Sequence, residues 1–247
     1  MILEARNISK VFSSEGAFRS SGKNSALENV SFTLDEFTTL GIVGESGSGK
    51  TTLAKIILGL VPASSGEIIF DRQIIGNFRK DVQIIFQNPY NSLDPKMRIK
   101  DALYEPLAIH NICPKRYYKE RAVKSLKDVG LDEDCLERFP SQFSGGQRQR
   151  ICIARSIACE PKLLVLDEPI SSLDLTIQAK LLELFVQLKR EYKLTYIFIS
   201  HNLAVIKYLA DQVIVLRAGK VVENSPSEKL FASPSQEYTR QLLEAAK

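Results

Sequence analysis

The chain has 247 residues and a mass of 27.7 kDa, which suits one large domain or two small ones and allows a substantial core. Hydrophobic residues make up 44% and charged residues 25%, so disordered, collagen-like and fibrous classes are excluded. The 33 Lys and Arg exceed the 29 Asp and Glu by 4, and this mildly basic balance permits an anionic ligand without requiring nucleic acid.

Three features of the sequence bear on the compartment in which the chain works. No apolar run approaches the ~18–20 residues that a membrane span needs, and the start, MILEARNISK, lacks the apolar core of a secretory signal. The cysteines form no CxxC and no zinc-like spacing, which predicts buried, reduced thiols; they are Cys113, Cys135, Cys152 and Cys159. We therefore expect the chain to stay in the cytosol.

The first part of the chain predicts short strands around a glycine-rich turn. Strands are expected at 2–12, 31–34, 38–43, 67–70 and 82–86, with a Ser- and Gly-rich loop at 13–25. Residues 88–140 then hold five of the ten prolines and charged, helix-like stretches such as 117–130. This change predicts an inserted, mainly helical subdomain.

From residue 147 the pattern alternates helix and strand. Helices are expected at 147–159 and 176–192, buried strands at 162–167 and 195–200, and a hairpin with a glycine turn at 213–223. Apolar strands that alternate with helices indicate an α/β fold with a mainly parallel sheet covered on both faces. There is no internal repeat, so one copy of the module is expected.

A phosphate-binding motif follows the strand at 38–43. It matches G-x-x-x-x-G-K-[ST] and reads Gly44, Glu45, Ser46, Gly47, Ser48, Gly49, Lys50, Thr51. The glycines let backbone N–H groups surround phosphate oxygens, and the next helix points its positive N-terminus at the same anion. Lys50 is expected to reach the β- and γ-phosphates of ATP, and the Thr51 hydroxyl to bind Mg²⁺.

An acidic pair ends the apolar run at 163–166. Buried parallel strands end at the sheet edge where α/β proteins bind their ligands. Such a pair alone is often a helix cap, but beside a phosphate loop it predicts catalysis. Asp167 is then expected to bind Mg²⁺, directly or through water, and Glu168 to act as general base on the attacking water.

A second glycine motif decides between families that carry a phosphate loop. Phe143-Ser144-Gly145-Gly146-Gln147 resembles the signature of the ATP-binding cassette (ABC) family, usually written LSGGQ. Ser144, Gly145, Gly146 and Gln147 open a helix and form a second anion cradle. The resemblance implies that two cassettes meet head to tail, with each ATP between one phosphate loop and the other signature. This motif argues against a kinase or other NTPase outside the ABC family.

Other landmarks fall in the family's order. The resemblance implies a glutamine that touches Mg²⁺ and water and contacts the membrane partner (Gln87), a D-loop (171–174), a switch histidine (His201) and a further ATP contact (Thr52). Phe12 matches the aromatic residue that stacks on adenine, with Phe18 as a competitor. Asn202 stands where many relatives have Asp, and we expect this to reduce activity rather than abolish it.

The resemblance covers essentially the whole chain as one ABC domain. It implies a core of residues 1–87 and 160–247 with an N-terminal antiparallel β subdomain, and a helical signature subdomain at about 88–159. Within the family, the chain most resembles the ATPases of oligopeptide, dipeptide and nickel importers. The segments that carry this narrower resemblance are 44–53, 86–95, 143–155 and the tail 233–245. That tail could also be a plain amphipathic terminal helix.

The expected function is to hydrolyse ATP for an importer at the cytoplasmic face of the membrane. Implied partners are two transmembrane permeases, a second ATPase that is a paralogue or the chain itself, and, indirectly, an extracytoplasmic binding protein. We expect residues 88–107 to dock on the permeases. Peptide is the leading cargo, with nickel or a metal chelate as alternative. A soluble ABC ATPase of translation or DNA repair is a more distant alternative.

Overall fold

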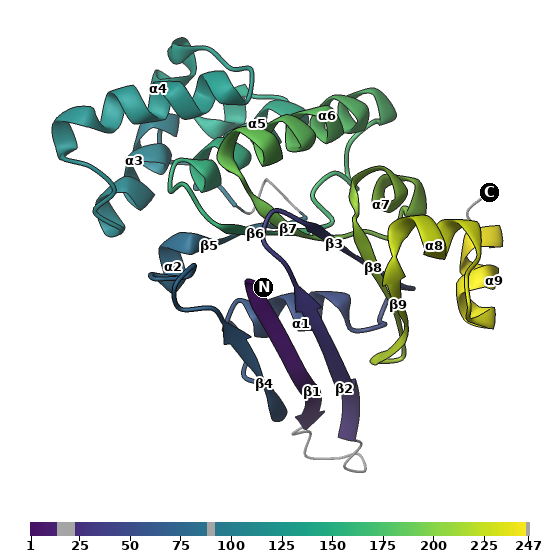
Figure 1. The fold of residues 1–247 in the computed structure, drawn as a ribbon. Helices are drawn as coiled ribbons and strands as arrows, with labels where there is room; N and C mark the ends of the chain where they lie inside the picture. Colours follow the sequence, from purple (N-terminus) through teal and green to yellow (C-terminus); the bar gives the residue numbers. More distant parts are fainter. Residues whose placement is uncertain (14–22, 88–91, 246–247) are drawn as a thin grey trace, which may run out of the picture. The chain divides into compact units, whose positions relative to one another are not determined.

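A computed structural model describes residues 1–13, 23–87 and 92–245, and divides the chain into two compact units. Unit 1 comprises residues 1–75 and 195–247, and unit 2 comprises residues 76–194. Both mix strands and helices, and each is described by itself (Figure 1).

Unit 1 contains two sheets. Its strands are β1 (Leu3–Ser13), β2 (Lys23–Leu34), β3 (Thr39–Val43), β4 (Ser65–Phe70), β7 (Thr195–Ile199), β8 (Gln212–Arg217) and β9 (Lys220–Pro226). Its helices are α1 (Lys50–Ile57), α7 (Leu203–Leu209), α8 (Ser227–Ala232) and α9 (Glu237–Ala245). The first sheet is antiparallel, in the order β2-β1-β4. In the second, β3 lies parallel to both β7 and β8, and β9 pairs antiparallel with β8.

The central strands of the second sheet in unit 1 are buried and mostly apolar. Every residue of β3 and β7 is buried, including the large side chains of Tyr196 and Phe198. Gly41 on β3 is a close-approach position, since a Cβ there would lie 2.7 Å from Cγ2 of Ile206 on α7. The helices α8 and α9 lie beside β9 (Figure 1).

Unit 2 is mainly helical around one parallel strand pair. Its elements are α2 (Phe78–Asp81), β5 (Val82–Ile85), α3 (Ile99–Ile109), η2 (Lys115–Tyr117), α4 (Tyr118–Asp128), η3 (Glu133–Glu137), η4 (Pro140–Gln142), α5 (Gly145–Ile157), β6 (Leu163–Asp167) and α6 (Leu175–Tyr192). The strand β5 pairs parallel with the fully buried β6, from Val82 opposite Leu163 to Ile85 opposite Leu166.

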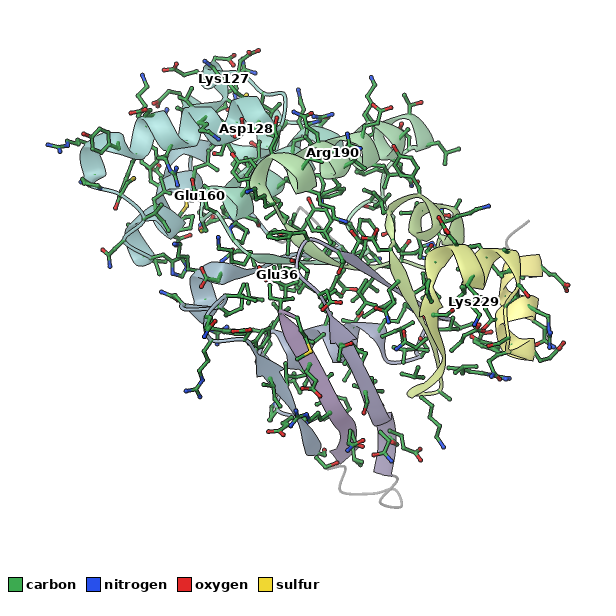
Figure 2. The ribbon with its side chains drawn as sticks, viewed as in Figure 1. Glu36, Lys127, Asp128, Glu160, Arg190 and Lys229 are labelled. Atoms are coloured by element: carbon green, nitrogen blue, oxygen red, sulfur yellow. The ribbon has the colours of Figure 1, made fainter. Side chains whose placement is uncertain are left out.

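A polar cluster joins the ends of α4 and α6 within unit 2. The Tyr192 hydroxyl donates a hydrogen bond to the Asp128 carboxylate. The ammonium of Lys124 lies 2.9 Å from the same carboxylate and 2.7 Å from the Tyr192 hydroxyl oxygen. Figure 2 labels Asp128 at the end of α4 and Arg190 in the last turn of α6. This cluster fixes the two helix ends relative to each other.

The structure corrects the predicted elements at several places. The loop expected at 13–25 is too long, because β1 runs to Ser13, β2 starts at Lys23, and these two residues are partners in the antiparallel register. The short helices α7 and α8 were not predicted. Phe18 and residues 88–91 of the expected docking segment lie outside the described residues.

Candidate functional site

The predicted phosphate loop joins β3 to α1 in unit 1, in the strand–loop–helix context that the motif requires. Gly44, Gly47 and Gly49 have φ values of 149°, 79° and 105°, which favour glycine. A Cβ on Gly44 would lie 2.1 Å from the carbonyl oxygen of Leu216 on β8. A Cβ on Gly49 would lie 2.6 Å from the carbonyl oxygen of Ala26 on β2. The loop thus lies against β8 of one sheet and β2 of the other.

The loop's lysine is buried and points back over the loop. Lys50 is 7% exposed, and its ammonium donates hydrogen bonds to the carbonyl oxygens of Gly44 at 2.7 Å and Glu45 at 2.8 Å. A buried ammonium is stabilised more by an anion than by neutral carbonyls, because opposite charges attract strongly where water is excluded. The lysine is therefore placed where a phosphate would replace weaker partners.

The loop also fits a phosphate at its centre. The Ser48 hydroxyl is buried and has no hydrogen-bond partner among the described residues. Gly47 faces open space, with nothing within 4 Å of a Cβ built on it. An orphaned buried hydroxyl suits an oxygen-rich ligand, because such a group is costly unless it is paired. These residues fit the phosphates of ATP.

His201 follows the strand next to the phosphate loop. Ile42 on β3 is opposite Ile199 on β7, and the Ser200 N–H donates to the Ile42 carbonyl at 3.3 Å. Parallel strands present their carboxyl ends at one sheet edge, so the loop after β3 and His201 after β7 share that edge. Both belong to unit 1, and the His201 side chain is exposed.

Asn202 has a structural role that sequence reasoning missed. Its side-chain oxygen accepts a hydrogen bond from the Ala204 N–H at 3.0 Å and caps α7. Its own N–H donates to the Ser200 hydroxyl at 3.0 Å. Asparagine and aspartate are both strong helix caps, so the helix after the histidine is kept while one charge is absent.

Phe12 lies on β1, opposite Asn24 of β2, and is 44% exposed. The ammonium of Lys10 lies 5.0 Å from the centre of its ring. Two residues beyond Asn24, the Ala26 carbonyl is the backbone group that Gly49 approaches. The ring of Phe12 is exposed and therefore available for stacking, and β2, the strand that pairs with β1, also contacts the phosphate loop. The contact of Phe12 with adenine stays a prediction.

The acidic pair lies in unit 2, at the carboxyl end of β6. Asp167 is 7% exposed, and Glu168 is half-buried with a φ of 49°, in the left-handed region. Non-glycine residues adopt this conformation at a cost of about 1–2 kcal/mol, and such strain gathers at functional sites. Gln87 follows β5, the parallel neighbour of β6, so it lies at the same sheet edge as the pair.

The signature motif opens α5 in unit 2, as predicted. The Ser144 hydroxyl accepts a hydrogen bond from the Gln147 N–H at 3.3 Å, and the Gln147 side-chain oxygen accepts one from the Ser144 N–H at 3.0 Å. This reciprocal pair is a capping box. A Cβ on Gly146 would lie 2.8 Å from Cγ2 of Ile177, so bare glycine lets α5 approach α6 closely.

The predicted site residues fall into two sets. Unit 1 contains the phosphate loop at 44–52, His201 at the same sheet edge, and Phe12 on β1. Unit 2 contains Gln87, Asp167 and Glu168 at one sheet edge, and the signature at the start of α5. Among the described residues, no group of three His, Cys, Asp or Glu side chains could hold a metal ion. The roles of these residues stay predictions.

Sequence reasoning missed the packing of the C-terminal tail against the end of β8. Tyr238 on α9 is 7% exposed, and Arg217 at the end of β8 packs on its ring at 4.5 Å. Burial, foremost, together with the nearby Glu45 carboxylate, raises the pKa of Tyr238. The signal that could have found this contact is the amphipathic pattern of 233–245, which predicted a helix without its partner.

Comparisons with curated proteins place the chain among transporter ATPases. Residues 27–171 match the family described as ABC transporter. The chain is 42% identical over 253 residues to the di/tripeptide transport ATP-binding protein DppF of Pseudomonas aeruginosa, covering 99% of the chain and 78% of that protein. It is also 42% identical to the oligopeptide transport ATP-binding protein OppF of Streptococcus mutans, covering 99% and 81%. The glutathione import ATP-binding protein GsiA of Pectobacterium atrosepticum is 42% identical, but the chain covers 37% of its length.

Solved structures resemble the fold over nearly the whole chain. The structure of cbiO1 from Clostridium perfringens, part of the ABC transporter complex cbiONQ, gives a TM-score of 0.79 at 27% identity and covers 94% of this chain and 91% of that one. The dimeric structure of MJ0796, a bacterial ABC transporter cassette, gives 0.77 at 27% identity and covers 92% and 99%. The α/β fold class expected from the sequence is confirmed.

Proposed function

Because the chain belongs to the ABC transporter family, and is therefore an ATP-binding ATPase, we propose that it powers an importer of peptides. The observation that carries the chemistry is the phosphate loop, with its buried Lys50, its orphaned Ser48 hydroxyl and its glycines held against β2 and β8. The names of the relatives support peptide as the cargo and do not favour nickel.

We assign the hydrolytic roles as the motifs imply. Residues 44–52 bind the phosphates of ATP, Phe12 stacks on adenine, and Glu168 is the general base with His201 and Gln87 assisting. Thr51, Asp167 and Gln87 are our candidate Mg²⁺ ligands, which suits an ion that is usually held by one or two carboxylates plus substrate phosphates. The ion, when bound, neutralises charge that develops on the phosphates.

We further infer that residues 144–147 bind the ATP held by a second cassette. Their place at the start of α5 supports this, because a helix N-terminus attracts anions. ATP binding then closes two cassettes, and loss of the γ-phosphate reopens them. The second cassette is a paralogue or another copy of this chain.

The proposed transport requires partner subunits that span the membrane. Among the described residues, no helix is long and apolar enough to span a membrane. We propose that two permease subunits at the cytoplasmic face of the membrane convert cassette closure into transport, and that an extracytoplasmic binding protein delivers the cargo. The segment 88–107 remains our candidate docking surface for the permeases.

The chemistry is tested with a matched pair of lysine variants. Lys50→Ala should lose ATP binding, measured by calorimetric titration, while Lys55→Ala, an exposed lysine on the same helix α1, should bind as wild type. Glu168→Gln should bind ATP but hydrolyse it at least 10²-fold more slowly, because general-base catalysis contributes about 10²–10⁴-fold. Normal ATP binding by Lys50→Ala would refute the loop assignment, and unaltered turnover would exclude Glu168 as the base.

The transport role is tested by capture of the tagged chain from detergent-solubilised native membranes, followed by mass spectrometry. Two permeases and a second ATPase are expected, and the associated binding protein can then be titrated with peptides and with nickel. Ribosomal or DNA-repair proteins without a permease would refute the importer and favour a soluble ABC ATPase.

A further inference from the structure

The link between α3 and α4 concentrates positive charge on the surface of unit 2. We define this link as residues 109–119, which end α3, pass through η2 and begin α4. It contains Lys115, Arg116 and Lys119, all exposed, and no Asp or Glu. Figure 1 shows the link at the margin of unit 2, at the opposite end of α4 from Asp128. Three positive charges without an acid between them thus lie in one short surface segment.

The link also exposes two large apolar side chains. Ile109 is 66% exposed and Tyr117 is 42% exposed. The guanidinium of Arg116 lies 4.9 Å from the centre of the Tyr117 ring, so a cation and an aromatic face are presented together. A single exposed apolar residue needs no explanation. Aromatic and aliphatic side chains among cations, however, are typical of surfaces that lie at a lipid–water interface.

The fold holds the link in a defined conformation. The Ile112 N–H donates a hydrogen bond to the Leu107 carbonyl at 3.0 Å, and Asn111 between them adopts a φ of 51°. The ring centres of Tyr104 on α3 and Tyr118 on α4 lie 5.7 Å apart, which joins the two helices next to the link. A surface segment that is already ordered loses little conformational freedom when it binds.

Acidic residues mark where this surface ends. Lys119 lies 2.6 Å from the Glu133 carboxylate, and both side chains are exposed, so the pair contributes little and its lysine can contact another anion. Glu120 and Glu133 line the same hollow on α4 as Arg116 and Lys119. The cationic surface is therefore confined to the link and the first turn of α4.

The position of the link in the chain favours a lipid surface as its partner. The link directly follows α3, which lies in the segment 88–107 that we propose docks on the permeases. A segment beside a permease-docking helix lies close to the headgroups of the bilayer. Anionic headgroups attract Lys and Arg near the membrane surface. The exposed Ile109 has no role in binding phosphates of a nucleic acid, but it can enter the headgroup region.

We propose that the α3–α4 link binds anionic lipid headgroups at the cytoplasmic face of the membrane. Lys115, Arg116 and Lys119 contact the headgroups, and Tyr117 and Ile109 enter the headgroup region. The surface shares no residue with the ATP-binding motifs, and the proposal takes from the proposed function that the chain works at a membrane. The link gives the cassette a contact with the bilayer in addition to its permeases.

The proposal is tested by co-sedimentation of the full chain with lipid vesicles. Wild type should bind vesicles of phosphatidylcholine mixed equally with phosphatidylglycerol, and should bind vesicles of phosphatidylcholine alone far more weakly. Combined Lys115→Gln, Arg116→Gln and Lys119→Gln should lower the partition coefficient about 10²-fold, because each basic residue near an anionic surface contributes about fivefold. Raising the salt from ~0.1 M to ~1 M should release wild type, because the charges are then screened.

A charge-matched variant tests whether the position of these cations matters. Combined Lys180→Gln, Arg190→Gln and Lys193→Gln removes three exposed cations from α6 and the residue after it, in the same unit. It should bind anionic vesicles within about threefold of wild type. Equal losses in the two triple variants would mean that net charge alone attracts the chain, and would refute the proposal. Equal binding of wild type to both kinds of vesicle, or to neither, would refute it as well.

A further variant tests the apolar part of the surface. Combined Ile109→Ser and Tyr117→Ser should weaken binding to anionic vesicles roughly tenfold and leave the salt dependence unchanged, because it removes apolar area and no charge. Binding equal to wild type would show a purely electrostatic contact and overturn the assignment to a lipid interface. Circular dichroism checks that each variant is folded, which is expected because the changed residues are exposed.

Two measurements separate this inference from the proposed function. The triple variant of the link should bind ATP as wild type in the calorimetric titration, because none of its residues is assigned to ATP. If permeases are captured while wild type fails to bind anionic vesicles, only the lipid contact falls. If no permease is captured but vesicle binding still depends on the link, the importer falls and the lipid contact stands.

Discussion

Two glycines of the phosphate loop should differ sharply in their tolerance of alanine. Gly47 and Gly49 both have positive φ, so an alanine at either position costs about 1–2 kcal/mol for its left-handed backbone. An alanine at position 49 has a further cost from steric overlap. Its Cβ would lie 2.6 Å from the Ala26 carbonyl oxygen and 2.7 Å from Cδ2 of Leu27, whereas a Cβ on Gly47 meets nothing within 4 Å. Such overpacking costs about 1–3 kcal/mol.

We therefore expect Gly49→Ala to lower the free energy of unfolding by about 2–5 kcal/mol and Gly47→Ala by about 1–2 kcal/mol. For a chain of this size, the expected difference of about 1–3 kcal/mol between the two variants corresponds to roughly 2–12 °C in Tm. Urea and thermal unfolding followed by circular dichroism, without nucleotide, measure both quantities. A difference below about 1 kcal/mol would refute the claim that Gly49 is fixed by its contact with β2 rather than by its φ alone.

Three further predictions concern other parts of the two units. Burial alone would raise the pKa of Glu223, but hydrogen bonds from the tail outweigh it and lower the pKa. The stability that this carboxylate contributes is therefore complete above pH ~4.5 and is lost as the pH falls. Glu223→Gln should lower the free energy of unfolding by about 1–3 kcal/mol and remove this pH dependence from the amide exchange of α9. Gly146→Ala should cost about 1–3 kcal/mol, and Ile177→Ala in the same chain should recover part of it in a double-mutant cycle; additive losses would contradict the contact. Burial raises the pKa of Cys152 to about 11. A thiol reagent at pH 8 should therefore leave Cys152 of the native protein unmodified while it reacts with the half-buried Cys113. Equal rates of modification at the two cysteines would contradict this prediction.

Sequence patterns located the buried strands well because their signal is local. The runs at 38–43, 162–167 and 195–200 correspond to β3, β6 and β7 within a residue at each end. The start of β2 was missed because residues 23–27 carry no apolar alternation, and pairing with β1 makes them a strand. The helix α7 was missed because it has only 7 residues and its cap, Asn202, was interpreted solely as a lost charge.

The sequence predicted some features of the candidate site, and others are visible only in the structure. Motif spacing identified the loop at 44–52 and the signature at 144–147, whose strand–loop–helix and helix-opening contexts the structure confirms. It could not show that Arg217 packs on the ring of Tyr238, because the sequence pattern gives no partner for the C-terminal helix. Nor could it show the left-handed backbone of Glu168, since no local pattern predicts it. The boundary of the helical subdomain at 88–159 stays a prediction.

At position 168, the left-handed backbone and the proposed catalytic role favour different residues. Asparagine tolerates the left-handed region better than glutamate, so Glu168→Asn should relieve part of the strain while it removes the carboxylate. A screen that ranks variants by melting temperature would then favour a variant that lacks the proposed general base. Any effort to make this chain more robust has to score turnover along with heat resistance, because at this residue the two aims select opposite side chains.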